Sequence, residues 1–217
     1  MLDVHAPHDA VHTWKSFFIH LVTIVIGLLI AVGLEQSVEW LHHRHQLREA
    51  RRELSTELEA NRRLLKANQD DLIKVQVALA QDMVILREHQ KTHAPLSGPL
   101  DYSWEFWRTP DAAWQTVKQN GTLSLMSYEE QKAYVFVYTV FGNVMDAATA
   151  FNTAIEVAGA IARRAPGESL SPQDIEELIT ATSDTQGKAA FTQKLLEFEG
   201  RGLDRVEAAA KTLGYKE

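Results

Sequence analysis

The amino-acid sequence lacks cysteine entirely, which excludes a disulfide framework, a thiolate nucleophile and a cysteine-ligated zinc site. Basic residues are outnumbered, 22 Lys and Arg against 29 Asp and Glu, and the net charge of −7 argues against duplex nucleic acid as a partner. Proline is scarce, and none stands between Pro7 and Pro95. Because proline is the strongest helix breaker, its scarcity favours a few long helices.

Signatures of catalysis and of β-structure are also missing. The sequence contains no G-x-x-x-x-G-K-[ST], G-x-G-x-x-G, H-E-x-x-H or G-x-S-x-G motif. No segment alternates convincingly between apolar and polar residues with a period of two. We therefore expect an all-α protein that is not an enzyme and holds no cofactor, although catalytic groups can also be assembled from distant positions.

What the sequence does contain is one long apolar run from Phe17 to Leu34, in which His20 is the only ionisable residue. As a helix rising ~1.5 Å per residue, the run is ~27 Å long, close to the ~30 Å hydrocarbon core of a bilayer. Trp14 and Trp40 flank it at about the spacing of the two headgroup regions, which tryptophan favours. The run therefore predicts an uncleaved transmembrane helix.

A secretory signal peptide is the alternative for an apolar run near the N-terminus. However, Lys15 is outweighed by Asp3 and Asp9, and the run is longer than a signal-peptide apolar core. After the run, basic residues outnumber those before it and share one helical face: Arg44, Arg48, Arg51 and Arg52. This face predicts contact with anionic lipid headgroups and a cytoplasmic C-terminal domain, the alternative being a solvated face paired with Glu49 and Glu53.

Polar and small residues form one stripe along the apolar helix, at spacings of three and four. They are Ser16, His20, Thr23, Gly27, Ala31 and, just past the run, Glu35. Small residues let another helix backbone approach closely, and hydroxyl or imidazole groups can bond across such a contact. The stripe predicts a protein partner within the bilayer, either a second copy or another membrane protein.

The 58 residues from 35 to 92 contain neither glycine nor proline and carry a heptad repeat. One row is apolar: Leu58, Leu65, Leu72, Leu79 and Leu86. The alternate row mixes apolar and polar residues: Leu54, Asn61, Asn68, Val75 and Asp82. This pattern predicts a long helix with coiled-coil-like packing, in which Ile73, Val77, Met83 and Val84 widen the buried face.

The later sequence predicts further helices. Pro95, Gly98 and Pro99 indicate a loop over 93–103, and a short helix follows, capped by Thr109 and ended by Gly121. Ser127 and Glu130 form a capping box that opens a helix to Arg164. Pro166 and Gly167 end it, and Ser171 with Pro172 starts a short acidic helix over 171–182. Residues 188–213 then carry Phe191, Leu195, Phe198, Val206 and Leu213 on a helix that Gly200 and Gly202 bend or break.

Several stretches resemble a family of uncharacterised bacterial single-pass membrane proteins. They are WKSF at 14–17, GLLIAVGLEQ at 27–36, Ala113 with Trp114, GTLSL at 121–125, and Tyr138. Proteins of this family join an N-terminal transmembrane helix to a helical soluble region. The resemblance implies a location in the bacterial inner membrane and brings no activity or catalytic residues with it.

Histidine and tryptophan supply the remaining candidate sites. Imidazoles close enough to chelate a metal occur at His5, His8 and His12, at His42, His43 and His45, and at His89 with His93. A transmembrane helix separates the first two groups, so we expect no specific metal site. Three tryptophans surround the predicted loop and short helix: Trp104, Trp107 and Trp114. They cap the end of a bundle core or form an exposed patch for a partner.

These observations predict a flexible tail over 1–13, a transmembrane helix with interfacial ends over 14–40, a charged helical stalk over 41–66 and a soluble helical bundle over 67–217. The expected function is that of a non-enzymatic, membrane-anchored interaction or scaffolding protein that self-associates through its transmembrane helix and stalk. The alternatives are an accessory or sensory subunit of a transporter or channel, and a membrane-tethered metal-binding protein or enzyme.

Overall fold

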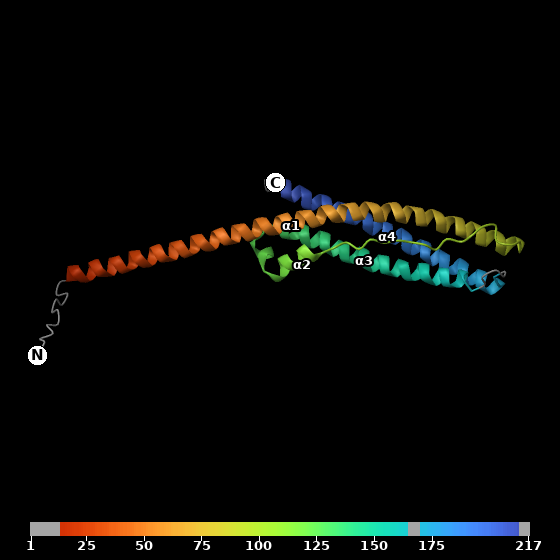
Figure 1. Cartoon of the computed structure of the whole chain (residues 1–217), viewed down its shortest axis with the longest axis horizontal. Coiled ribbons are helices and arrows are strands. Elements are labelled where there is room, and N and C mark those ends of the chain that lie inside the picture. Colours follow the sequence, from red (N-terminus) through yellow and green to blue (C-terminus); the bar gives the residue numbers. More distant parts are fainter. Residues whose placement is uncertain (1–13, 165–169, 213–217) are drawn as a thin grey trace, which may run out of the picture. The chain divides into compact units, whose positions relative to one another are not determined.

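Four α-helices and one short 3₁₀ helix make up the regular structure of the computed structural model, which describes residues 14–164 and 170–212. They are α1 (Trp14–Thr92), α2 (Ala112–Gln119), η1 (Thr122–Leu125), α3 (Tyr128–Ala162) and α4 (Pro172–Thr212) (Figure 1). Within these residues no strand occurs, so the predicted all-α fold is confirmed. The chain divides into two units, one ending at Glu49 and one beginning at Ala50.

The first unit consists of the N-terminal part of α1, and its apolar side chains are exposed to the surroundings. No residue of the most apolar 18-residue window is buried, and the mean hydropathy of that window is 2.7. The Thr23 hydroxyl donates a hydrogen bond to the carbonyl of Ile19 at 2.9 Å. Within an apolar helix, the backbone carbonyl four residues earlier is the nearest acceptor for such a hydroxyl. Trp14 stacks on Phe17 near the start of the helix.

The second unit is a bundle of three long helices: the part of α1 from Ala50 onward, α3 and α4. The start of α3 lies beside Arg51, and its end packs on Leu86, so these two helices run in the same direction. α4 runs the opposite way, because its start packs on Leu86 and its end contacts Arg62. The core lies between them, and Phe151 is its largest fully buried side chain.

Burial on α1 follows the predicted heptad rows, and all ten of their residues are buried. Leu54, Leu58 and Leu65 already belong to the bundle core, so the expected start of the bundle at residue 67, after a stalk over 41–66, moves back to Ala50. Of the additional apolar residues expected to widen this face, Met83 is half-buried, but Ile73, Val77 and Val84 are 54%, 54% and 66% exposed, so the prediction is wrong for these three. They lie on the outer side of the helix, away from both rows.

An extended segment over 93–111, here called the strap, follows α1. It begins at His93, whose φ of 54° turns the chain out of the helix, and it contains the prolines and glycine that predicted a loop. Figure 1 shows the strap running back along the bundle to α2. The short helix begins at Ala112, later than the expected cap at Thr109, while Gly121 ends it in the left-handed region with φ of 76° as expected.

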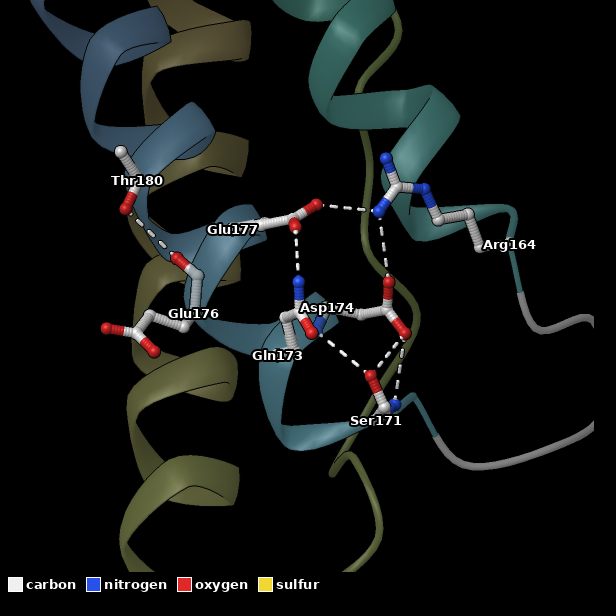
Figure 2. Close-up of polar contacts among 7 residues, drawn as sticks. All are labelled: Arg164, Ser171, Gln173, Asp174, Glu176, Glu177 and Thr180. Carbon is white, nitrogen blue, oxygen red and sulfur yellow. Dashed lines mark hydrogen bonds and ion pairs between the residues drawn. The ribbon is translucent and has the colours of Figure 1, made fainter.

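The predicted N-cap serines of α3 and α4 are confirmed, but only half of the capping box predicted for α3 forms, because the Glu130 carboxylate binds Arg51. Ser127 occupies the N-cap of α3 and accepts the backbone N–H of Glu130. Ser171 precedes α4, and its hydroxyl accepts the N–H of Asp174 at 3.1 Å while the Asp174 carboxylate accepts from Ser171 (Figure 2). Figure 2 also shows Arg164, at the end of α3, donating to Asp174 and Glu177 of α4. Pro166 and Gly167, the expected end of the preceding helix, lie outside the described residues.

The predicted short helix over 171–182 and the predicted bend or break at Gly200 and Gly202 are both wrong, because α4 is continuous from Pro172 to Thr212. One of its glycines, Gly202, allows close packing against α3. A Cβ added at Gly202 would lie 3.1 Å from the Val137 side chain on α3, and one added at Gly200 would touch Leu65 on α1. The cost of glycine in a helix interior is therefore offset by close contact between helices.

Candidate functional site

The polar and small stripe of the apolar helix has no partner within the described chain. Thr23 and His20 are exposed, and a Cβ added at Gly27 would meet nothing within 4 Å. Ala31 and Glu35 continue the same face and are exposed as well. The stripe therefore presents an open face of small side chains to whatever surrounds the helix.

The four arginines of the predicted headgroup face divide into two groups. Arg44 lies over the Trp40 ring at 5.3 Å, and Arg48 is exposed. An arginine stacked on tryptophan next to an apolar run is typical of the bilayer interface. Arg51 points elsewhere: it makes two hydrogen bonds, of 2.7 and 2.9 Å, to the Glu130 carboxylate of α3. Arg52 pairs with Glu53 at the surface.

The histidines of the described chain are not arranged as a metal site. The rings of His42 and His43 lie 6.4 Å apart, and His45 lies 3.9 Å from the Glu49 carboxylate. Among residues 14–164 and 170–212, no three His, Asp or Glu side chains are grouped to hold a metal ion. His5, His8 and His12 lie outside the described residues.

The three tryptophans do not form one patch. Trp114 is buried and stacks on Tyr138 with ring centroids 4.8 Å apart. Trp104 is half-buried against Phe151 at 4.4 Å, whereas Trp107 is 51% exposed. The first two therefore belong to the core, and only Trp107 remains available on the surface.

A ladder of polar side chains on α1 holds the strap to the bundle. The Asp82 carboxylate accepts the N–H of Asp101, Asn68 bonds both the N–H and the C=O of Trp107, and Asn61 donates to the carbonyl of Pro110. These three side chains are at most 2% exposed. An extended backbone that lacks a neighbouring strand needs such partners, because unpaired backbone groups are costly when buried.

Glu57 continues this ladder one helical turn before Asn61. Its carboxylate accepts the N–H groups of Ala113 and Trp114 at the start of α2, and it also accepts the Tyr138 hydroxyl at 2.5 Å. A carboxylate at this position acts as an N-cap of α2, and its negative charge interacts favourably with the positive end of the helix dipole. Burial and the adjacent Glu57 carboxylate raise the pKa of Tyr138, so its hydroxyl remains a donor.

Two carboxyl groups are buried without a basic partner in the described contacts. Burial raises the pKa of Asp82 to about 6, opposed by the hydrogen bond from Asp101. Burial also raises the pKa of Glu199 to about 8, and the Glu199 Oε1 atom has no hydrogen-bond partner within the described part of the chain. Glu199 faces the core from α4 and is 1% exposed. It is therefore largely protonated at neutral pH.

Among the described residues, the bundle has a cavity at one end and a groove between two of its helices. A cavity of about 800 Å³ lies where α1 and α3 end, among His89, His93, Asp101 and Arg163. A groove of about 420 Å³ lies between α3 and α4, lined by Asn143, Asp146, Ala147, Ala150, Lys188, Phe191 and Leu195. Of the residues that the sequence singles out as site candidates, the pair His89 and His93 lines the cavity, whereas none of the stripe, arginine-face or tryptophan residues lines either opening.

The strap ladder and Glu199 are the features that sequence reasoning missed. The signal for the ladder was present, because Asn61, Asn68 and Asp82 occupy heptad positions that an apolar core would fill with leucine. Glu199 gave no such signal, because Phe198 and Leu195 beside it suggested a different buried face. Burial of a carboxyl in that place depends on the rotation of α4 in the bundle.

Comparison with known proteins finds no similar sequence or structure. No family model, no curated protein and no solved structure matches this chain. Within its described residues, the chain has an all-α fold and one helix that is long and apolar enough to cross a membrane.

Proposed function

We propose that the protein is a non-enzymatic, membrane-anchored interaction or scaffolding protein that self-associates. The observation that supports this proposal is the uncovered apolar run. Thirteen large apolar side chains between Phe17 and Leu34 are at least 40% exposed, and no other part of the described chain covers them. The core helix of a soluble protein with the same composition would be mostly buried.

The energetic argument for lipid around this helix is simple. Burying a large apolar side chain contributes roughly 1.5–3 kcal/mol, so leaving thirteen of them partly in water costs on the order of 10 kcal/mol or more. A bilayer removes this cost without requiring any contact from the rest of the chain. An apolar helix also satisfies its own backbone hydrogen bonds, which is the condition for crossing lipid.

Self-association follows from the stripe on the same helix. Lipid provides no hydrophobic driving force for one apolar helix to join another, so close packing at small residues and interhelical hydrogen bonds decide the partner. Gly27 and Ala31 offer the close approach, and His20 and Thr23 offer the hydrogen-bonding groups. A second copy of this chain is the simplest partner, because it presents the same stripe.

The location that we propose is the bacterial inner membrane, with a single pass and the helical bundle in the cytoplasm. The support for this orientation is the excess of Lys and Arg after the apolar run over the single Lys15 before it. Arg51 pairs with Glu130 inside the bundle, but Arg44, Arg48 and Arg52 remain exposed after the run and still contribute to this excess.

The anchor can be tested on the full chain expressed in bacteria. We expect the protein to remain with the membrane after alkaline carbonate washing, and to be released by detergent. Because the chain has no cysteine, a single Lys74→Cys substitution reports orientation through its reaction with a membrane-impermeant maleimide. Protein that is soluble without detergent, or that lacks the apolar run after purification, would contradict the anchor.

Self-association can be tested by mass measurement in mild detergent. We expect Gly27→Leu to lower the dimer fraction about tenfold, because the larger side chain separates the helix backbones, whereas Val25→Leu on the same helix leaves it unchanged. Co-purification of a polytopic membrane protein with a monomeric chain would favour the accessory-subunit alternative, with His20 and Glu35 facing the larger protein.

A further inference from the structure

The residues of α4 are distributed in an unusual way between the core and the surface. The inner stripe of the helix contains Thr192 and Glu199, both buried. Next to them in the sequence, Phe191 and Phe198 are 58% and 47% exposed. A helix that places two phenylalanines outside and a carboxyl group inside leaves apolar surface available for a partner.

Phe191 and Leu195 form one wall of the groove between α3 and α4. The opposite wall consists of small or short side chains on α3, among them Ala147 and Ala150. A Cβ added at Gly142, on the same helix, would meet nothing within 4 Å. Large side chains on one wall and small ones on the other are the complementary halves of a helix–helix contact.

The charged residues at this groove carry opposite signs on its two walls. Lys188 lies on the α4 wall and Asp146 on the α3 wall, and both line the same groove. Lys188 reaches Asp184 on its own helix, whereas Asp146 is exposed and makes no ion pair among the described residues. If two copies met across a two-fold axis along the groove, Lys188 of each copy would lie opposite Asp146 of the other. The charges on the two walls therefore suit a second copy of the same surface.

We propose that the groove between α3 and α4 is the face through which the bundles of two copies associate. This inference deepens the proposed self-association and rests on it: the anchor holds two copies in one bilayer, where the second contact forms at high effective concentration. In the pair, α3 and α4 of both copies form a four-helix arrangement, with Phe191 and Leu195 packed on Ala147 and Ala150 of the second copy. The charge contacts at the rim set the register of this arrangement.

The test uses charge reversal in the full chain, in mild detergent and in lipid nanodiscs. Lys188→Asp and Asp146→Lys each place like charges across the axis, and we expect each to weaken dimerisation about tenfold. The combined variant restores opposite charges and is expected to recover dimerisation to within about threefold of the wild type. Lys74→Asp, a charge reversal on the exposed side of α1, serves as the matched control and is expected to have no effect.

The outcomes separate this inference from the proposed function. Single variants that dimerise like the wild type, or a combined variant that does not recover while its thermal unfolding is unchanged, would overturn the groove as the interface. If Gly27→Leu alone then dissolves the dimer, the proposed self-association stands and the groove inference fails. A wild-type chain that is monomeric in both detergent and nanodiscs contradicts both.

Discussion

Asn68 and Trp107 are joined by two hydrogen bonds, from Asn68 Nδ2 to the Trp107 carbonyl at 2.9 Å and from the Trp107 N–H to Asn68 Oδ1 at 2.8 Å. One buried side-chain amide thus satisfies both backbone groups of a residue in the strap, as a neighbouring strand would in a sheet. The strap remains extended and ordered without β-structure because α1 supplies such groups at heptad spacing.

Replacing Asn68 with Ala is expected to destabilise the bundle by about 1–3 kcal/mol, because it removes both hydrogen bonds that hold the Trp107 backbone. Thermal unfolding of the full chain in detergent, followed by circular dichroism, measures the effect. Gln81→Ala, at an exposed position of the same helix, is the control and is expected to leave the melting temperature unchanged. An equally small effect at both positions would show that Asn68 does not hold the strap.

Glu199→Leu is expected to stabilise the bundle by roughly 1–3 kcal/mol at neutral pH, because it replaces a buried carboxyl with an unpaired oxygen by an apolar side chain of similar volume. Chemical unfolding at pH 7 measures the difference. Thr192→Val, one heptad earlier on the same inner stripe, is a useful comparison, because its hydroxyl is already satisfied by the carbonyl of Lys188. A destabilised Glu199→Leu variant would mean that the carboxyl has a partner in solution.

The stability of the wild type is expected to fall as the pH rises from about 4.5 to 8. In this range the folded state holds the proton on Glu199 while the unfolded state has lost it, since the pKa is raised from 4.5 to about 8. The raised pKa of Asp82, about 6, acts in the same direction at lower pH. Unfolding free energies across this pH range measure the slope, and Glu199→Gln should flatten it above pH 6. A slope of the opposite sign would contradict burial of the neutral carboxyl.

Tyr138→Phe is expected to destabilise the bundle by about 1–2 kcal/mol, because it removes a hydrogen bond to a charged acceptor inside the bundle. Glu57→Ala should cost more, because it also leaves the start of α2 uncapped. Trp114 stacks on Tyr138, so exposure of this region in the Glu57 variant should move tryptophan fluorescence to longer wavelength. Unchanged fluorescence would place the loss elsewhere.

Glu130→Gln is expected to destabilise the bundle by roughly 3 kcal/mol, because it leaves the partly buried Arg51 guanidinium without its carboxylate. The pair Arg51→Met and Glu130→Gln together should lose less than the sum of the single variants, and a double-mutant cycle measures the coupling. Arg52→Met, which removes an exposed pair, is the control. Simple additivity would indicate that the two residues do not interact in solution.

Much of the fold could be predicted from the sequence, because local signals determine helices. The apolar run, the leucine heptads and the caps at Ser127 and Ser171 place α1, α3 and α4 with little information from the rest of the chain. These signals arise from backbone hydrogen bonding and from periodicity, and both act over a few residues.

Only the tertiary structure decided which face of each helix is covered and what the polar core residues bind. Phe191 and Phe198 are exposed and Glu199 is buried because α4 packs with its glycine close to Val137, a contact between positions far apart in the chain. Arg51 leaves the arginine face because it pairs with Glu130, which lies 79 positions later in the chain. The sequence by itself determined where helices form and that one of them suits a bilayer, whereas rotation, partners and grooves were set by long-range packing, which no local pattern encodes.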